Sequence, residues 1–183
     1  IDAHADLHSP STTPSGNIHG LPLAAVLGHD NLDCQVNDVA KDIEDHWNEM
    51  KSIGVPGPKV LAENLVYFGV RDTEEAEDKQ IEKLHIRNYN VDEGRYRGLE
   101  TCVDEALAKL AHCDVLYISF DVDSMDCDLI SFGTGTPVSR GFDQYEIIDI
   151  INQIIQCKKV VCIEVVEVNP LLDTKGNKMA ETA

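Results

Sequence analysis

The 183-residue chain has the length of a single domain, and its 43% of hydrophobic residues is enough for a core. Acidic side chains outnumber basic ones by 33 to 15, a net charge of −18 that argues against nucleic acid as a partner and suits a cationic ligand. No apolar run reaches the roughly 18 to 20 residues of a membrane helix, so we expect no membrane partner. The six cysteines show no CxxC pair and no zinc spacing, and we expect a cytoplasmic location.

The first notable segment places Asp2, His4 and Asp6 at alternate positions. In an extended segment, side chains two residues apart point to the same side, so these three can face a common point. Carboxylates gathered in this way repel one another unless a cation lies among them. The segment therefore predicts metal ligands.

Residues 31–59 form a polar stretch with a helical pattern at 39–50, and the stretch ends in the sequence VPGP. We expect a surface insertion here rather than a second domain, so that 1–183 is one domain.

Three short apolar segments, rich in β-branched residues, predict buried parallel strands at 64–70, 115–120 and 160–168. Amphipathic helical patterns accompany them at 73–84, 99–112 and 142–156. This alternation predicts an α/β fold with three layers, α/β/α, and a mostly parallel sheet.

Acids lie at the ends of these strands: Asp72 follows the first, Asp121 and Asp123 follow the second, and Glu167 lies near the end of the third. The carboxyl ends of parallel strands meet at one edge of a sheet, where α/β proteins bind ligands. Glu167 lies within an apolar segment, where an unpaired charge is costly, so we favour it over Glu164 as a functional acid.

Four carboxylates with one imidazole favour manganese among the divalent ions. One catalytic ion needs fewer ligands, whereas two ions about 3.5 to 4 Å apart would use them all and could activate a bridging hydroxide. We therefore expect two Mn²⁺ per subunit, held by Asp2, His4, Asp6, Asp121 and Asp123.

Five motifs occur along the chain: DAHAD at 2–6, SGNIHG at 15–20, SFDVD at 119–123, GTGTP at 133–137 and EVNP at 167–170. In order and spacing they resemble the arginases of the ureohydrolase family. The resemblance implies a binuclear manganese enzyme that cleaves the guanidinium of L-arginine to L-ornithine and urea by attack of a metal-bridging hydroxide. It also implies homotrimers, or homohexamers built from them.

The resemblance further assigns roles to individual residues. Asp2 and Asp121 would bridge the ions, and Asp6 would bind one ion and hold the hydroxide. His4 and Asp123 would complete the other ion. His19 would be the proton shuttle, and Glu167 would be the carboxylate that pairs with the substrate guanidinium. Thr136 would make a supporting polar contact to the substrate.

The amino-acid end of the substrate is assigned in the same way. Ser15 and Asn17 would bind the α-carboxylate, and acids after the first strand would hold the α-amino group: Asp72, Glu74 and Glu77. Acids in the first turn of a helix also complement its dipole, so a purely structural role stays open for these three.

Three positions depart from the family pattern. His8, at a substrate-contacting position, replaces an asparagine, Glu74 replaces an aspartate, and Cys127 replaces a proline. His8 and Glu74 can still form the hydrogen bonds of the residues they replace, but their side chains differ in length. The length of substrate that the site prefers therefore stays open. The family's Gly-Gly-Asp-His-Ser motif and its last helix are not in this sequence, and we expect the chain to be part of a longer protein.

Three alternative functions stay open or can be weighed against the sequence. A related ureohydrolase could act on agmatine or a guanidino acid, although agmatine has no α-carboxylate for the 15–20 motif to bind. A non-catalytic relative has no need for so many converging charges. The deacetylases that share the fold use one zinc ion and a histidine pair, neither of which is visible here.

Overall fold

The computed structural model describes all residues, 1–183, and divides into two compact units. Unit 1 contains Ile1–Ala3, Val66–Asp72 and Asn88–Ala183, and unit 2 contains His4–Leu65 and Thr73–Arg87. Each unit is described by itself, and the expectation of a single domain stays a prediction.

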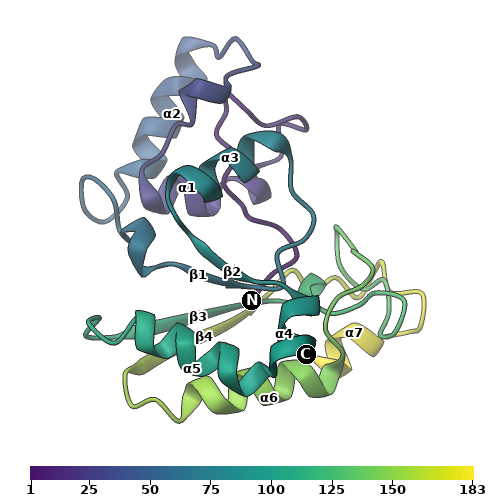
Figure 1. Cartoon of the computed structure of the whole chain (residues 1–183). Helices are drawn as coiled ribbons and strands as arrows, with labels where there is room; N and C mark the ends of the chain where they lie inside the picture. The colour runs from purple at the N-terminus through teal and green to yellow at the C-terminus, as the bar shows by residue number, and fades with distance from the viewer. The chain divides into compact units, whose positions relative to one another are not determined.

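Unit 1 is built on short strands. β3 (Leu116–Asp121) and β4 (Val160–Val166) pair in parallel, while β1 (Val66–Phe68) pairs with β2 (Arg87–Tyr89) (Figure 1). The first residues of the chain connect the two pairs, because the Asp2 amide donates to the Phe68 carbonyl at 3.0 Å and the Asp121 amide donates to the Ile1 carbonyl at 2.9 Å. The start of the chain is thereby fixed at the end of β3.

Four helices belong to unit 1: α4 (Val91–Arg97), α5 (Leu99–Lys109), α6 (Gln144–Ile155) and α7 (Lys178–Thr182). α6 begins at Asp143, whose carboxylate accepts from the amide of Glu146 at 2.9 Å, while the Glu146 carboxylate accepts from the amide of Asp143 at 2.7 Å. α5 and α6 lie side by side along β3 and β4 (Figure 1). Their inner faces and β3 form a core that includes Val103, Ala106, Phe120, Val122, Phe142, Ile147 and Ile150.

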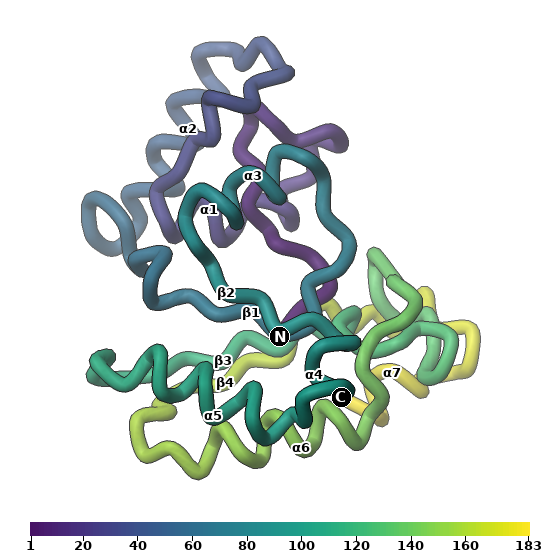
Figure 2. The backbone as a smooth tube through the Cα atoms, viewed as in Figure 1, coloured from purple at the N-terminus to yellow at the C-terminus, as the bar shows by residue number.

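Unit 2 contains α1 (Pro22–Leu27), α2 (Lys41–Lys51) and α3 (Glu75–Lys83), with single-turn 3₁₀ helices at Ile18–Gly20, Leu32–Cys34 and Ala62–Asn64. α1 packs against α2 (Figure 2) around a small core of Leu21, Ala24, Ala25 and Trp47. The Trp47 indole donates to Asp30 Oδ1 at 2.6 Å, which attaches α2 to the loop after α1. This explains how a largely polar helix stays in place.

Seven predicted elements are present: β1, β3 and β4 among the strands, and α2, α3, α5 and α6 among the helices. All are shorter than predicted except β3, which keeps its length and is displaced by one residue. The prediction that β4 is buried is wrong, since Val161, Ile163 and Val165 are 64%, 44% and 47% exposed. An apolar run in the sequence indicates a strand that is suited to burial. It does not indicate which part of the molecule would cover that strand. None of the helices is both long and apolar enough to cross a membrane.

Candidate metal centre

Three of the predicted metal ligands lie in unit 1: Asp2, Asp121 and Asp123. Carboxylate oxygens of Asp2 and Asp123 lie within 4.8 Å of each other, and Asp121 and Asp123 are only 6% and 1% exposed. Burial, followed by the charges of Asp2 and Asp123, raises the pKa of Asp121 to about 10. A divalent cation would reverse this penalty, so the donor set fits a metal ion.

A turn brings Asp121 and Asp123 together. β3 ends at Asp121, and Val122–Ser124 form the 3₁₀ helix η4. Asp121 Oδ1 accepts a hydrogen bond from the Asp123 amide at 2.9 Å, and the Ser124 hydroxyl donates to the Asp121 carbonyl at 2.6 Å. The expectation that one extended segment carries both acids is therefore corrected, because the backbone leaves the strand conformation after Asp121.

Both oxygens of the Asp123 carboxylate are held. Oδ1 accepts from the Ala3 amide at 3.1 Å, and Oδ2 accepts from the Thr136 hydroxyl at 3.1 Å. Thr136 thus orients a predicted metal ligand, while its predicted substrate contact stays a prediction.

The other two predicted ligands, His4 and Asp6, belong to unit 2, and both are half-buried. The segment that carries them is not a strand, contrary to the expectation of an extended run. Asp6 has a φ of +54°, in the left-handed region that residues other than glycine seldom adopt. Such conformations cluster at functional sites, which supports a role for this acid.

Glu167 also has a left-handed backbone, with a φ of +62°. It follows β4, which ends at Val166, and it is exposed, so the expectation of a charge inside an apolar strand is wrong. The Asn169 amide donates to the Gly133 carbonyl at 2.8 Å. The 167–170 motif is therefore attached to the 133–137 motif, as two parts of one site would require.

The remaining motif of unit 2 is an exposed surface segment. Ser15, Asn17 and His19 are all exposed, and the Ser15 hydroxyl oxygen accepts from the Asn17 amide at 3.1 Å. His19 lies in the single-turn helix Ile18–Gly20. All three side chains are thus accessible to a ligand.

His8 joins two acids in unit 2, Glu74 just before α3 and Glu77 in its first turn. Its Nε2 lies 2.8 Å from Glu74 Oε2 and 3.5 Å from Glu77 Oε2, and its Nδ1 lies 3.1 Å from the Thr12 hydroxyl. The hydrogen bond with His8 lowers the pKa of Glu74, whereas burial raises the pKa of Glu77, which also accepts from the Leu7 amide at 3.0 Å.

Two of the predicted acids therefore have partners within the chain. The Glu74 amide also donates to Glu77 Oε2 at 3.3 Å, at the start of α3. Asp72, which belongs to unit 1, is exposed, and its amide donates to the Ala3 carbonyl at 3.0 Å. The structural and substrate-binding roles are compatible for Glu74, whose side chain is exposed, whereas Glu77 is buried and its carboxylate is bonded within the chain.

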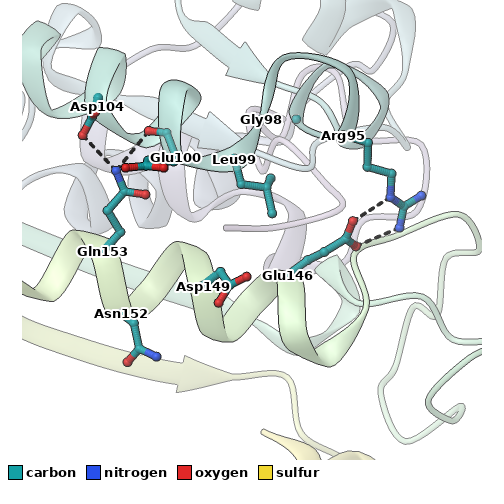
Figure 3. Close-up of a pocket in the computed structure, with 10 residues that line it drawn as sticks. Arg95, Gly98, Leu99, Glu100, Asp104, Glu146, Asp149, Asn152 and Gln153 are labelled. Carbon is teal, nitrogen blue, oxygen red and sulfur yellow. Dashed lines mark hydrogen bonds and ion pairs between the residues drawn. The ribbon is translucent and has the colours of Figure 1, made fainter.

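A recess of about 910 Å³ opens on unit 1 beside α5 and α6 (Figure 3). None of the predicted site residues lines it. Arg95 forms two hydrogen bonds with the Glu146 carboxylate, at 2.7 and 2.8 Å, and Gln153 donates to Asp104 at 2.8 Å. These contacts hold the helices to one another, and we assign the recess no ligand.

Comparisons with known proteins agree with the motifs. A model described as "Arginase family" matches residues 1–183. Arginase of Bacillus subtilis (strain 168) is 36% identical over 184 residues, which cover 100% of this chain and 55% of that protein. The crystal structure of Bacillus subtilis arginase has a TM-score of 0.84 at 33% identity, over 99% of this chain and 56% of that one.

A second solved structure, Entamoeba histolytica arginase in complex with L-ornithine, has a TM-score of 0.81 at 26% identity, over 99% of this chain and 54% of that one. The chain therefore spans about half the length of the curated relatives and solved structures it matches. These likenesses confirm the predicted α/β fold class.

Proposed function

Since this chain belongs to the arginase family, we propose that the protein hydrolyses the guanidinium group of L-arginine to L-ornithine and urea with two manganese ions. The observation that carries the proposal is the crowding of Asp2, Asp121 and Asp123 at the end of β3, where burial and like charge raise the pKa of Asp121. Such an arrangement is unfavourable in a purely structural role, and it suits a cation-binding role.

The proposed ligands are Asp2, His4, Asp6, Asp121 and Asp123. Hard carboxylates with one imidazole match the preference of manganese. When bound, the two ions would lower the pKa of water enough to make hydroxide available near neutral pH. The chain's own contribution is to hold these ligands, and the bonds from Ala3 and Thr136 to Asp123 do so for one of them.

The substrate guanidinium is a planar fork of donors, which a carboxylate orients best. We assign this task to Glu167, whose exposed position after β4 leaves the carboxylate accessible. We assign to His19 the transfer of a proton onto the departing amine, because an imidazole can accept and donate protons near neutral pH. Its exposed position in Ile18–Gly20 suits that role.

At the amino-acid end, Ser15 and Asn17 would bind the α-carboxylate, while Asp72, Glu74 and Glu77 would hold the α-amino group. The Entamoeba histolytica arginase structure contains L-ornithine, the product expected here. This assignment favours L-arginine over agmatine, which lacks the carboxylate.

A second candidate function follows from the bond between His8 and Glu74. The imidazole occupies an oxygen that an α-amino group would otherwise use. A guanidino acid without that amino group would not compete with His8. The second candidate is therefore a ureohydrolase that acts on guanidinobutyrate or a similar guanidino acid.

Release of urea in the presence of manganese tests these proposals, with L-arginine, agmatine and guanidinobutyrate as substrates. We expect kcat/KM to be highest for L-arginine and roughly 10- to 100-fold lower for each analogue that lacks one charged group, because a charge-assisted hydrogen bond contributes about 1.5 to 3 kcal/mol. Preference for guanidinobutyrate would establish the second candidate. Absence of urea from all three substrates would make the protein a non-catalytic relative.

Assembly into homotrimers or homohexamers is proposed on the family resemblance. Sedimentation of the purified protein as a monomer at micromolar concentration would contradict it.

A further inference from the structure

Arg71 lies outside the five sequence motifs, yet its guanidinium has an extensive set of partners. It lies three residues after the end of β1 and donates to four backbone carbonyls. The acceptors are Gly69 at 3.1 Å, Asp123 at 3.0 Å, Val138 at 2.9 Å and Ser139 at 3.0 Å. All belong to unit 1, and they come from three separate segments of the chain.

The backbone of Arg71 contributes to the same arrangement. Its amide donates to the Ala3 carbonyl at 2.8 Å, and the Ala3 amide donates to Asp123 Oδ1 at 3.1 Å. The side chain of Arg71 holds the Asp123 carbonyl at the same time. Asp123 is thus restrained at both its main chain and its carboxylate, and Arg71 takes part in both restraints.

The surroundings of the guanidinium are shaped for it. A Cβ atom on Gly141 would lie closest to the Ser124 carbonyl oxygen and 2.6 Å from both Arg71 Nη2 and the Asp126 amide nitrogen, so glycine leaves space for the backbone and for the guanidinium. Burial lowers the pKa of Arg71, while the nearby carboxylates of Asp123 and Asp126 act in the opposite direction. A planar fork of donors can reach several carbonyls at once, which the single ammonium of a lysine cannot reproduce.

We propose that Arg71 is a positioning residue that fixes Asp123 in the orientation needed to hold manganese, a proposal that rests on the function proposed above. The guanidinium joins the turn after β3 to the 138–139 segment, close in sequence to Thr136, which bonds the other carboxylate oxygen of Asp123. Without it, the main chain of Asp123 and the 138–139 segment beside Thr136 gain freedom, although the Arg71 amide still bonds Ala3. The metal ligand would then have to be ordered when the ion binds.

Manganese affinity tests this role without recourse to activity. Purified wild-type protein, Arg71→Lys and Arg71→Gln are titrated with Mn²⁺, and the free ion is followed by its electron paramagnetic resonance signal. We expect the dissociation constant to rise roughly 10- to 100-fold in both variants, the usual effect of losing a group that orients a metal ligand. Circular dichroism confirms that each variant is folded at the temperature of the titration.

Arg97→Lys is the matched control. Arg97 is also in unit 1 and pairs with two carboxylates, Glu93 at 2.7 Å and Glu105, but it has no bond to Asp123 or Thr136. Its manganese affinity is expected to equal that of the wild type.

The outcomes separate the two proposals. If the wild type binds no manganese, the proposed function fails and this inference fails with it. If the wild type binds manganese and the folded Arg71 variants bind it equally well, the function stands and the positioning role is wrong. A lower melting temperature with unchanged affinity, or unfolding of both variants, would show that Arg71 serves the fold in general, which also overturns the inference.

Discussion

In unit 2 the carboxylates of Glu74 and Glu77 meet the imidazole of His8, whereas in unit 1 the carboxylate of Asp121 meets those of Asp2 and Asp123. Buried Glu77 also accepts hydrogen bonds from the amides of Leu7 and Glu74. The acids of unit 2 are therefore stabilised by groups of their own chain.

In unit 1 the neighbouring carboxylates add to the effect of burial, and the pKa of Asp121 rises to about 10. Acid-rich segments of similar composition can therefore serve different purposes. In unit 2 an imidazole lies between the two carboxylates, while in unit 1 the carboxylates face one another without such a group, which suits a cation.

Replacing Asp121 should have the largest effect. Asp121→Asn removes a proposed shared ligand. The metal-free variant should melt at about the temperature of the wild type, because a carboxyl group with a pKa of about 10 is already uncharged at neutral pH, but manganese should no longer raise its melting temperature. Elemental analysis should show that most of the bound manganese is lost.

Glu77→Gln is the matched control, since it also neutralises a buried carboxylate, but in unit 2. Its manganese content should equal that of the wild type. Unchanged manganese in Asp121→Asn would contradict the proposed metal centre.

A replacement at His19 should have the next largest effect and tests whether unit 2 supplies proton transfer. His19→Ala is expected to lower kcat roughly a hundredfold or more, the usual scale of general acid–base catalysis, while manganese stays bound. Steady-state kinetics and elemental analysis measure the two quantities. His112→Ala, beyond the end of α5 and outside every motif, should change neither. Loss of metal in His19→Ala, or full activity, would show that the assigned role is wrong.

Replacing His8 should have the smallest effect and tests the acids of unit 2. His8→Asn shortens the side chain that bonds Glu74, and we expect it to lower the free energy of unfolding by about 1 kcal/mol, the usual net value of a hydrogen bond. The KM for L-arginine should fall, because Glu74 is released to bind the α-amino group. Urea denaturation and steady-state kinetics measure these changes.

Exposed His46 of α2 provides the matched control, because His46→Asn should alter stability by less than about 0.5 kcal/mol. A higher free energy of unfolding in His8→Asn would show that His8 does not stabilise the carboxylates of Glu74 and Glu77.

Local patterns identified the longer elements, because an amphipathic helix or an apolar strand repeats its signal over several turns or alternations. α3, α5 and α6 lie within the predicted helices, and β3 lies within one residue of its predicted end. The shorter α1, α4, α7 and β2 were not predicted, since their three to seven residues give too little periodicity.

The residue types of the candidate site were also visible in the sequence. The DAHAD, SFDVD and EVNP motifs carry acids whose chemistry indicates a divalent cation and a guanidinium substrate. What alternation along a strand could not predict is the backbone of these segments. Asp6 and Glu167 are left-handed, and Asp123 lies in η4 rather than in β3.

By itself, then, the sequence determined the fold class, the longer helices and strands, and the chemical character of the acids, because these depend on residue type and local periodicity. The tertiary structure alone decided that β4 is exposed, that His8 bonds Glu74 and that Arg71 holds Asp123. Those bonds join residues 66 and 52 positions apart in the chain. No local pattern encodes partners at such a separation, since they meet only when the packing of the intervening segments brings them within hydrogen-bond distance.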